Sequence, residues 1–523
     1  MLNLTPDQRA LGRANANEVI GSTRRDFLKA AATVPALGAF YFGYQQLGDK
    51  PPVKAAIIGT GDEGCQAMIR YHNRDYVNYI GLCDIRPSQQ ERGIKEFGAH
   101  KQYTADDVAK LKKYDNVDAM LDDKDVEMVV IALPLWLHAP VAIKAMKAGK
   151  HVFCEKLMAH DVTECKEMVK VAHETNKLLA IGHQRHYSAL YDNANFLVQE
   201  GHLGEIRHIR ALWHRNNAVP QIEKNSDGSL AYDDQGNPVY KKDKAGQVLY
   251  FDSWNKPTPA ADENVDFAKY GYKSLKELIC WRLYNRTGAG LMAELGSHQL
   301  DACSIFLGKK HPLAVTGIGG TFFYTDGREV DDHVFVNFEF PGKAEKDHTV
   351  VTYSSINTNA FETYGEELMG TRGTMIVEGE KEILLYKEID RNTWKAGGPK
   401  TTSVVVETAK SGKPVVETSP SAAGPSAAAS YGAAATTDPS RGYREELEHF
   451  AYCIRNANTS NVHDVPDKDK PRCRGEVALA DAVIALTSNI AMREKRRIEF
   501  DPKWFDWQSP DVPETSGRLA QKG

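Results

Sequence analysis

The chain has 523 residues, of which 42% are hydrophobic and 26% charged, and its formal net charge at pH 7 is −5. This length is enough for two domains or more. The slight acidity, without any Lys/Arg block interleaved with aromatics, excludes a general affinity for nucleic acid or acidic membranes. The eight cysteines are scattered without zinc-ligand spacing, so they predict neither a metal site nor a disulfide framework.

The first 50 residues are interpreted as a targeting segment outside the fold. Residues 22–29 read Ser-Thr-Arg-Arg-Asp-Phe-Leu-Lys, which resembles the twin-arginine export motif, and an apolar run follows from Ala30 to Tyr44. The alternative is a basic helix start beside an apolar helix. Because this route exports folded proteins, we expect a periplasmic or exported protein that acquires its cofactor before export. Residues 36–38 match a cleavage site poorly, so an uncleaved anchor stays open.

The next element is a short apolar strand that runs directly into a Gly-rich turn. Val53 to Ile58 is followed by Gly59-Thr60-Gly61-Asp62-Glu63-Gly64, and a helix is expected from about Glu63 to His72. In a dinucleotide-binding turn, Gly59 permits the tight turn and Gly61 lets the backbone approach a pyrophosphate. Gly64 lets the helix pack closely on the strand. The alternative is an ordinary strand-turn-helix that happens to contain three glycines.

A second strand, residues 79–83, ends at Asp84, which lies 20 residues after Gly64. An acid at this place can accept hydrogen bonds from a ribose 2′-hydroxyl, so the pattern indicates a bound dinucleotide. Asp84 would repel a 2′-phosphate, which favours NAD. Arg86 lies two residues further on and could contact such a phosphate, so NADP stays open.

Strands and helices then alternate in a rhythm typical of a doubly wound parallel sheet. Strands are expected at 129–133, 151–154 and 178–181, and helices at 138–148 and 162–175. The ligand crevice of such a sheet lies at the carboxyl ends of its strands. Three polar segments follow these ends and should converge there: Leu133-Pro134 with His138, Glu155-Lys156, and residues 182–185.

Beyond a helix near residues 187–201, the pattern changes to one of alternating strands. Strands are expected at 206–213, 312–318, 334–340, 349–355 and 498–500, with helices at 443–455 and 475–492. We predict an α/β domain with an open, mostly antiparallel sheet. The expected domains are a Rossmann domain at 51–183 and a substrate and oligomerisation domain at 184–500, followed by a tail at 501–523. Two insertions interrupt the second domain: surface loops near 216–276 and a flexible tract at 408–440.

A second polar motif occurs at residues 288–301, where Glu294, His298 and Asp301 are spaced to share one face of a helix. A carboxylate one turn from a histidine can orient it and tune its pKa. A solvated polar face or a capping network explains the spacing equally well. A metal site on His298 and Asp301 ranks low because no further ligand has convincing spacing.

Four blocks together resemble the glucose-fructose oxidoreductase / inositol dehydrogenase / MocA family. They are the Gly turn with Asp84, Leu133-Pro134 with His138, Cys154-Glu155-Lys156, and residues 294–301. The resemblance implies an N-terminal Rossmann domain, a C-terminal α/β domain with an open sheet, and oxidation or reduction of a sugar or polyol with NAD or NADP. It also implies a homo-oligomer, because the family often uses the open sheet for subunit contacts.

The resemblance assigns roles to individual residues. Lys156 matches the lysine beside the nicotinamide, and His298 matches the acid/base histidine. Glu294 stands where Asp is usual, and Leu157 replaces the usual Pro after Lys156. The expected catalytic residues are Lys156, His298 and Glu294. The expected cofactor contacts are Gly59, Thr60, Gly61, Glu63, Gly64, Asp84, Arg86, Leu133, Pro134, His138, Glu155, Lys156 and Gln184. The expected substrate contacts are Arg185, Tyr187 and Asp301.

The expected reaction is hydride transfer between a nicotinamide cofactor and a sugar, polyol or sugar-derivative hydroxyl. His298 would take the hydroxyl proton, Lys156 would stabilise the alkoxide, and Glu294 would orient His298 or bind a neighbouring hydroxyl. One alternative is a glycosidase that oxidises its sugar transiently with bound NAD. A second is a non-catalytic NAD-bound binding protein. The expected partners are a small sugar or glycan and the twin-arginine translocation machinery.

Overall fold

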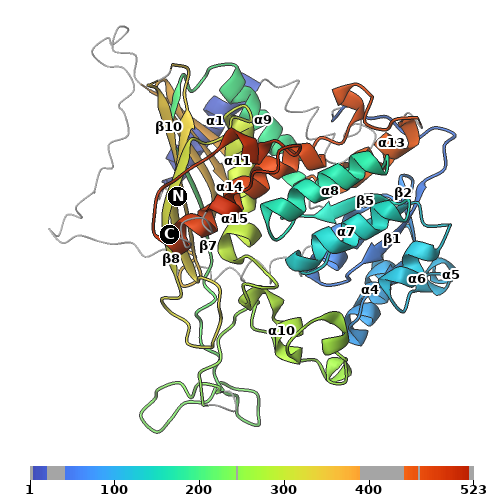
Figure 1. The fold of residues 1–523 in the computed structure, drawn as a ribbon. Coiled ribbons are helices and arrows are strands. Elements are labelled where there is room, and N and C mark those ends of the chain that lie inside the picture. Colours follow the sequence, from blue (N-terminus) through green and yellow to red (C-terminus); the bar gives the residue numbers. More distant parts are fainter. Residues whose placement is uncertain are drawn as a thin grey trace, which may run out of the picture.

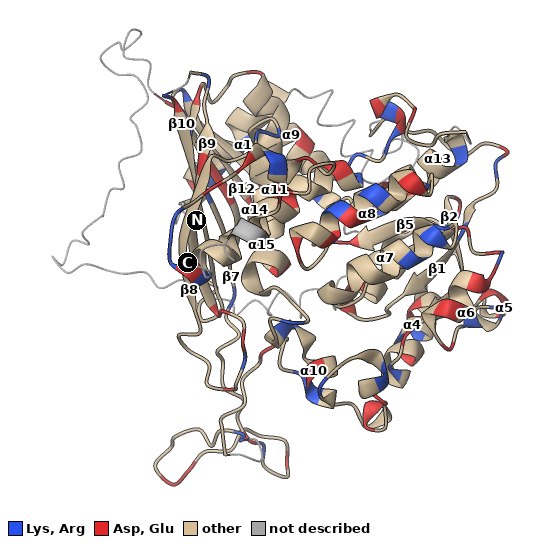
Figure 2. Ribbon diagram, viewed as in Figure 1, with Lys and Arg blue, Asp and Glu red and all other residues tan. Residues whose placement is uncertain are grey.

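The structure, a computed structural model, describes residues 4–20, 42–242, 246–344, 346–388, 441–457 and 460–516. The twin-arginine motif, most of the apolar run after it and the tract 408–440 lie outside these residues. The described chain forms two sheets that face each other across a layer of helices (Figure 1). Basic and acidic residues are interspersed along the ribbon of both halves in this view, as expected for a chain of small net charge (Figure 2).

Sheet A is the parallel sheet that the sequence predicts. Its strand order is β3-β2-β1-β4-β5-β6. The strands are β1 (Val53–Ile58), β2 (Val77–Cys83), β3 (Lys112–Lys113), β4 (Met128–Ile131), β5 (His151–Glu155) and β6 (Leu179–Gly182). β1 lies between β2 and β4 with five of its six residues buried, which explains its continuous apolar sequence. Because the chain reverses its strand order between β1 and β4, a ligand crevice opens at their carboxyl ends.

The helices around sheet A connect its strands. They are α4 (Pro87–Ala99), α5 (Ala105–Ala109), α6 (Val117–Asp122), α7 (His138–Lys147) and α8 (Val162–Glu174), and α13 (Tyr443–Asn456) joins them from much later in the chain. The first helix, expected at 63–72, covers residues 62–71, and its stretch Gly64–Ile69 is a π-helix. The elements expected from the alternation of strand and helix therefore agree with the structure to within a few residues, but α4, α5, β3 and α6 were not predicted.

Sheet B is the open sheet of the second domain, with strand order β13-β12-β11-β7-β10-β9-β8-β14. The strands are β7 (Ile206–His214), β8 (Ala314–Gly320), β9 (His333–Pro341), β10 (His348–Ile356), β11 (Tyr364–Gly370), β12 (Gly373–Glu378), β13 (Glu382–Lys387) and β14 (Ile498–Glu499). Only the β7–β10 pair is parallel among these described strands, which confirms the mostly antiparallel prediction. β9 alternates buried residues such as Phe338 with exposed ones such as Phe335, so one face of the sheet meets the core.

The inner face of sheet B packs against α9 (Ala189–Gln199), α11 (Ser297–Phe306) and α14 (Gly475–Glu494), and the short helix α10 (Leu275–Ile279) lies apart, beside sheet A (Figure 1). Among the described residues, α14 is the one helix long and apolar enough to span a membrane. However, 78% of its apolar window is buried inside the protein. The fold therefore uses α14 as a core helix between the two domains.

The N-terminal segment does not lie wholly outside the fold. Residues 6–20 form α1 (Pro6–Ile20), which packs on β13, where Arg9 pairs with Glu382 at 2.7 Å. Further along, Tyr44 is buried and its hydroxyl donates to Glu448 at 2.6 Å. The prediction that the first 50 residues lie outside the fold is wrong for these two segments, because a linear motif does not show what packs beside it.

The insertion and the tail also differ from expectation. Residues 220–242 and 246–250 do form an exposed arm held by isolated β-bridges, but residues 252–272 pack against the Rossmann domain, where Asp262 accepts from Ser88 at the start of α4. In the predicted tail, the ammonium of Lys166 donates to three carbonyls between residues 503 and 511. Glu514, in α15 (Pro513–Ser516), accepts from the Val162 backbone at 2.7 Å. Residues 252–272 and the predicted tail therefore both pack against the Rossmann domain.

Candidate functional site

The Gly-rich turn has the geometry that its sequence indicates. Gly59 has φ +91°, and a Cβ there would lie 2.3 Å from the Ala132 carbonyl oxygen, so a side chain is excluded. A Cβ on Gly64 would lie 2.1 Å from the Gly59 oxygen, which confirms that Gly64 permits close packing of helix on strand. A Cβ on Gly61 would meet nothing within 4 Å, because Gly61 borders the cavity. The turn thus leaves space at the helix start for a phosphate group.

The Asp84 carboxylate accepts hydrogen bonds from two backbone N–H groups, one in this turn and one in the segment after Asp84. Thr60 N donates to one carboxylate oxygen at 2.8 Å, and Arg86 N donates to the other at 2.9 Å. Each oxygen retains a further lone pair, so Asp84 can accept ribose hydroxyls. Burial raises the pKa of Asp84, although these N–H donors act in the opposite direction. Thr60 itself is fully buried and positions Asp84 rather than lining the cavity.

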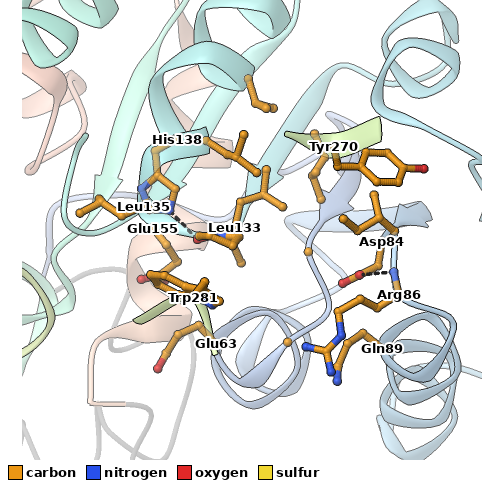
Figure 3. A pocket seen from close by; sticks show the side chains of 18 of the residues that line it. Glu63, Asp84, Arg86, Gln89, Leu133, Leu135, His138, Glu155, Tyr270 and Trp281 are labelled. Carbon is orange, nitrogen blue, oxygen red and sulfur yellow. Dashed lines mark hydrogen bonds between the residues drawn. The ribbon is translucent and has the colours of Figure 1, made fainter. Parts of the chain in front are cut away.

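A cavity of about 320 Å³ lies at the carboxyl ends of β1, β2, β4 and β5. Figure 3 shows Asp84, Arg86 and Gln89 at one end of it and His138, Glu155 and Trp281 toward the other. One wall belongs to the Rossmann domain; the other comes from residues 270–294 of the second domain. An elongated cavity from a ribose-binding acid to Lys156 fits a dinucleotide laid across the strand ends.

His138 contacts two segments at the cavity, one after β4 and one after β5. Its Nδ1 lies 2.8 Å from the Leu157 oxygen and its Nε2 lies 2.9 Å from the Leu133 oxygen. His138 therefore connects the end of β4 with the turn after β5, where the peptide bond preceding Leu157 is cis. Burial lowers the pKa of His138. Leu133, Pro134 and His138 all line the cavity, as the sequence predicted.

Glu155 and Lys156 follow β5 and face the same cavity. Burial and the nearby charge of Glu63 raise the pKa of Glu155 to about 8, so this carboxyl is largely protonated at pH 7. The Lys156 ammonium donates to the Glu294 backbone oxygen at 2.8 Å. The structure thus brings Lys156 from sheet A against Glu294 from the second domain, at the end of the cavity remote from Asp84.

Glu294 lies in a π-helical turn, Met292–Gly296, which leads directly into α11. Its carboxylate accepts from Arg282 Nε at 2.6 Å. Burial raises the pKa of Glu294, but the charges of Arg282 and Lys156 outweigh it and hold the pKa below its ordinary value. The π turn changes the residue spacing on which the predicted shared helix face depended. Glu294 consequently pairs with Arg282 and not with the His298 ring.

His298 lies beside Lys156, behind the cavity rather than on its lining. It is 8% exposed, and its ring packs against Trp213 with centroids 5.5 Å apart. Burial lowers the pKa of His298 well below its usual range, and the positive charges of Lys156 and Arg185 add to this effect. The imidazole is therefore neutral at pH 7 and able to accept a proton.

Besides Gly64, which packs beneath the turn, four other predicted site residues do not line the cavity. Gln184 and Arg185 are buried at the domain boundary, where Arg185 pairs with Glu366 at 2.8 Å. The Tyr187 hydroxyl lies 2.7 Å from His449 Nδ1. Asp301 accepts from His186 at 2.9 Å and from Lys309 at 3.0 Å. The predicted contacts of Arg185, Tyr187 and Asp301 have no support in this arrangement, because their polar groups are engaged elsewhere, whereas the buried Gln184 Oε1 has no hydrogen-bond partner among the described residues.

Sequence reasoning missed most of the second wall. Its residues come from the end of the insertion and the segment after it: Tyr270, Tyr272, Leu278, Trp281 and Arg282. The Rossmann side also contributes Asp62, Gln89 and residues 116–118. Aromatic residues in an otherwise polar insertion were the one available signal for the second wall. No local spacing could show that this segment folds back over sheet A.

Comparisons with known proteins agree with this two-domain fold. Residues 53–183 match the family model described as an oxidoreductase family with an NAD-binding Rossmann fold, and residues 266–376 match the GFO/IDH/MocA C-terminal domain. An uncharacterised oxidoreductase of Schizosaccharomyces pombe is 24% identical over 337 residues, covering 63% of this chain and 72% of that protein. Inositol 2-dehydrogenase of Salmonella paratyphi B is 26% identical over 173 residues, covering 33% of this chain and 48% of the enzyme.

Two further similarities bear on the cofactor domain and on the fold. A glycosyl hydrolase family 109 protein of Phocaeicola vulgatus is 28% identical over 166 residues, covering 31% of this chain and 39% of that protein. The aldose-aldose oxidoreductase of Caulobacter crescentus has a similar fold, with a TM-score of 0.53 and 18% identity over 86% of this chain and all of that one. The two matched domains and these similarities together show that the chain is an NAD-binding oxidoreductase of the GFO/IDH/MocA family.

Proposed function

We propose that the protein transfers a hydride between NAD and a carbinol carbon of a sugar, polyol or sugar derivative. The observation that carries the proposal is the Lys156 ammonium, fixed at 2.8 Å from the Glu294 carbonyl at the end of the cavity remote from Asp84. The match to inositol 2-dehydrogenase, a polyol enzyme by name, supports the substrate class.

Asp84 and the Gly59–Gly64 turn would hold the adenosine and pyrophosphate parts of NAD, and Glu155 and Lys156 would border its nicotinamide. When bound, NAD supplies a hydride acceptor at C4 of the nicotinamide ring. Lys156 binds the substrate oxygen and stabilises negative charge on it as the C–H bond breaks. The neutral His298 ring accepts the hydroxyl proton, so the alcohol becomes a carbonyl by loss of one hydride and one proton.

Glu294 and Arg282 act on the substrate side of Lys156. Their ion pair keeps Glu294 ionised, so that the carboxylate can accept a hydrogen bond from a neighbouring substrate hydroxyl. Its engagement with Arg282 makes it a substrate-binding group and not an orienting partner of His298. A substrate with adjacent hydroxyls suits this pairing of an ammonium donor with a carboxylate acceptor.

A second candidate is a glycosidase that oxidises its sugar transiently, eliminates the glycosidic substituent, adds water and reduces the carbon again. The similarity of 166 residues of this chain to a glycosyl hydrolase family 109 protein favours it. Net turnover by this route consumes no NAD, whereas a dehydrogenase accumulates reduced cofactor.

One assay separates the two candidates. The purified protein is mixed with NAD and a panel of sugars, polyols and aryl glycosides while absorbance at 340 nm and product masses are followed. Steady formation of reduced nicotinamide with a keto product supports the dehydrogenase. Release of the aglycone without accumulation of reduced nicotinamide supports the glycosidase. Tight NAD binding with neither result across the panel contradicts both.

Export and assembly remain part of the proposal. We expect the Arg24-Arg25 pair to direct the folded protein through the twin-arginine route, tested by exchanging both for Lys and fractionating cells. The exposed residues Ile318, Phe335 and Val350 on sheet B support a homo-oligomer built on this face. Light scattering of the purified protein measures the number of subunits.

A further inference from the structure

A carboxylate from the insertion occupies a donor site beside Asp84. Asp262 is fully buried and accepts three hydrogen bonds from the Rossmann domain. Arg86 Nε donates to Oδ2 at 2.9 Å, the Ser88 backbone N–H donates to Oδ1 at 2.9 Å, and the Ser88 hydroxyl donates to Oδ2 at 2.6 Å. Asp262 lies 174 positions after Ser88 in the chain.

These three donors form an anion-binding set. Ser88 lies in the first turn of the 13-residue helix α4, whose N-cap residue is Arg86 and whose start has no side-chain cap of its own. A free helix N-terminus, a hydroxyl and a guanidinium are the groups that proteins use to bind phosphate. Asp262 supplies the missing anion, and its hydrogen bonds and ion pair outweigh burial, which raises its pKa, so that the net pKa is lowered.

One member of the donor set, Arg86, lies where the ribose would be bound. Arg86 N is bonded to Asp84 at 2.9 Å, and both residues line the cavity (Figure 3). A 2′-phosphate on that ribose would require the Arg86 guanidinium and the start of α4 as partners. Both are already engaged with Asp262, and the Asp262 carboxylate would repel the phosphate.

We propose that Asp262 is a specificity residue that makes the protein select NAD over NADP. It acts by filling, with a built-in carboxylate, the donors that would otherwise receive a 2′-phosphate. The Asp84 carboxylate would repel a 2′-phosphate on the ribose. Asp262 pairs with the Arg86 guanidinium, the cation that would otherwise offset this repulsion. The inference concerns the adenosine half of the cofactor and does not depend on which substrate is oxidised.

The test uses two probes that differ only in the 2′-phosphate: 5′-AMP and 2′,5′-ADP. Their dissociation constants are measured by calorimetry on full-length protein freed of bound nucleotide, in the wild type and in Asp262→Ser. We expect the wild type to prefer 5′-AMP. The substitution should shift the ratio of the two constants toward 2′,5′-ADP by about tenfold to a hundredfold, the range for one hydrogen bond to a charged group.

Glu263→Gln is the matched control, because it removes the same charge from the adjacent, exposed residue. It should leave the ratio unchanged. Adding Arg86→Gln to Asp262→Ser should abolish the gain, since the guanidinium would be the phosphate's partner. If Asp262→Ser does not fold, the near-isosteric Asp262→Asn is used, with a smaller shift in the same direction.

A different result overturns the inference. If Asp262 merely fastens the insertion to sheet A, its replacement weakens 5′-AMP and 2′,5′-ADP by the same factor and the ratio stays constant. An equal shift in Glu263→Gln would show that only the general charge matters. Direct titrations with NAD and NADP should reproduce the same change in preference, whatever the outcome of the substrate panel.

Discussion

The two walls of the cavity are built in different ways. The Rossmann wall is formed by residues that directly follow strands, such as Asp84 after β2 and Lys156 after β5. The facing wall comes from an insertion and a π-helical turn, and Arg282 and Glu294 reach the cavity through packing of distant segments. The first wall follows from the general chemistry of nucleotide binding, whereas the second depends on the packing of segments that are distant in sequence.

This contrast separates cofactor recognition from the choice of substrate. The parallel sheet presents turns and acids at one edge, and any dinucleotide can use them. The second wall supplies the groups that would touch the reacting molecule, together with Asp262, which bears on the adenosine end. Substitutions in either wall should therefore have distinguishable effects on cofactor binding and on turnover.

The largest effect is expected at Lys156. Replacing Lys156 by Ala removes the cation that stabilises the substrate oxygen, so turnover should fall by about 10³-fold. The cofactor should remain bound, because the Gly59 turn and Asp84 are untouched. The rate of nicotinamide reduction with the best panel substrate and the dissociation constant for NAD measure the two effects. Lys147→Ala, on the outer helix α7, is the control, and equal rates in both variants would contradict the role.

A smaller loss is expected at His298 in the second domain. His298→Asn should lower turnover by about 10²-fold, near the lower end for a positioned base. The pKa of His298 lies well below its usual range, which makes the ring a weak proton acceptor. A solvent isotope effect on the remaining rate distinguishes slowed proton transfer from a structural defect. An unchanged rate would assign the proton to another group.

Arg282 tests the electrostatics of the second wall. Arg282→Gln removes the main partner of Glu294, so the pKa of Glu294 should rise and the acidic limb of the pH–rate profile should move to higher pH. At pH 7 we expect a loss of about tenfold, since one charge-assisted hydrogen bond is involved. Arg286→Gln, which breaks the Arg286–Glu277 pair instead, should leave the limb in place. A limb that shifts equally in both would refute the assignment.

The same contrast explains what the sequence could predict. Gly59, Gly64, Asp84 and Lys156 were found because backbone geometry and strand ends fix such positions locally. Arg185 was expected beside the substrate, yet it is buried and neutralised by Glu366. A motif indicates which residues lie near a strand end, but not whether a carboxylate from a distant strand, such as Glu366 in β11, pairs with them.

Segments with no local signature were predicted least well. The pairing of α1 with β13 depends on Glu382, and the closure over the ribose depends on Asp262; both acids are far from their partners in sequence. The π turn at Met292–Gly296 likewise arises from tertiary packing, because residue spacing alone favours a regular helix there. The nucleotide-binding role of the Rossmann wall could be predicted from the sequence, whereas the residues of the second wall could be identified only from the structure.

The last expected effect, at Glu155 on the Rossmann wall, concerns stability rather than turnover. Its pKa is raised from an ordinary value of 4.5 to about 8, so the folded state holds a proton that the unfolded state releases above pH 4.5. The free energy of unfolding should therefore fall as pH rises from 4.5 to 8, by at most about 1.4 kcal/mol per pH unit. Glu155→Gln cannot lose this proton, so its melting temperature should decline less over that range, by a few degrees.

Thermal unfolding of both proteins at pH 5, 6, 7 and 8 measures the difference, with Glu167→Gln on the exposed face of α8 as the control. Identical slopes for Glu155→Gln and the wild type would mean that Glu155 is ionised in the folded state. NAD should enlarge the effect if Glu155 borders the nicotinamide in its protonated form, because binding would then favour the proton further. A binding constant for NAD that weakens between pH 7 and 9 in the wild type, but not in Glu155→Gln, would connect this carboxyl to the cofactor and extend the comparison of the two walls to the nicotinamide end.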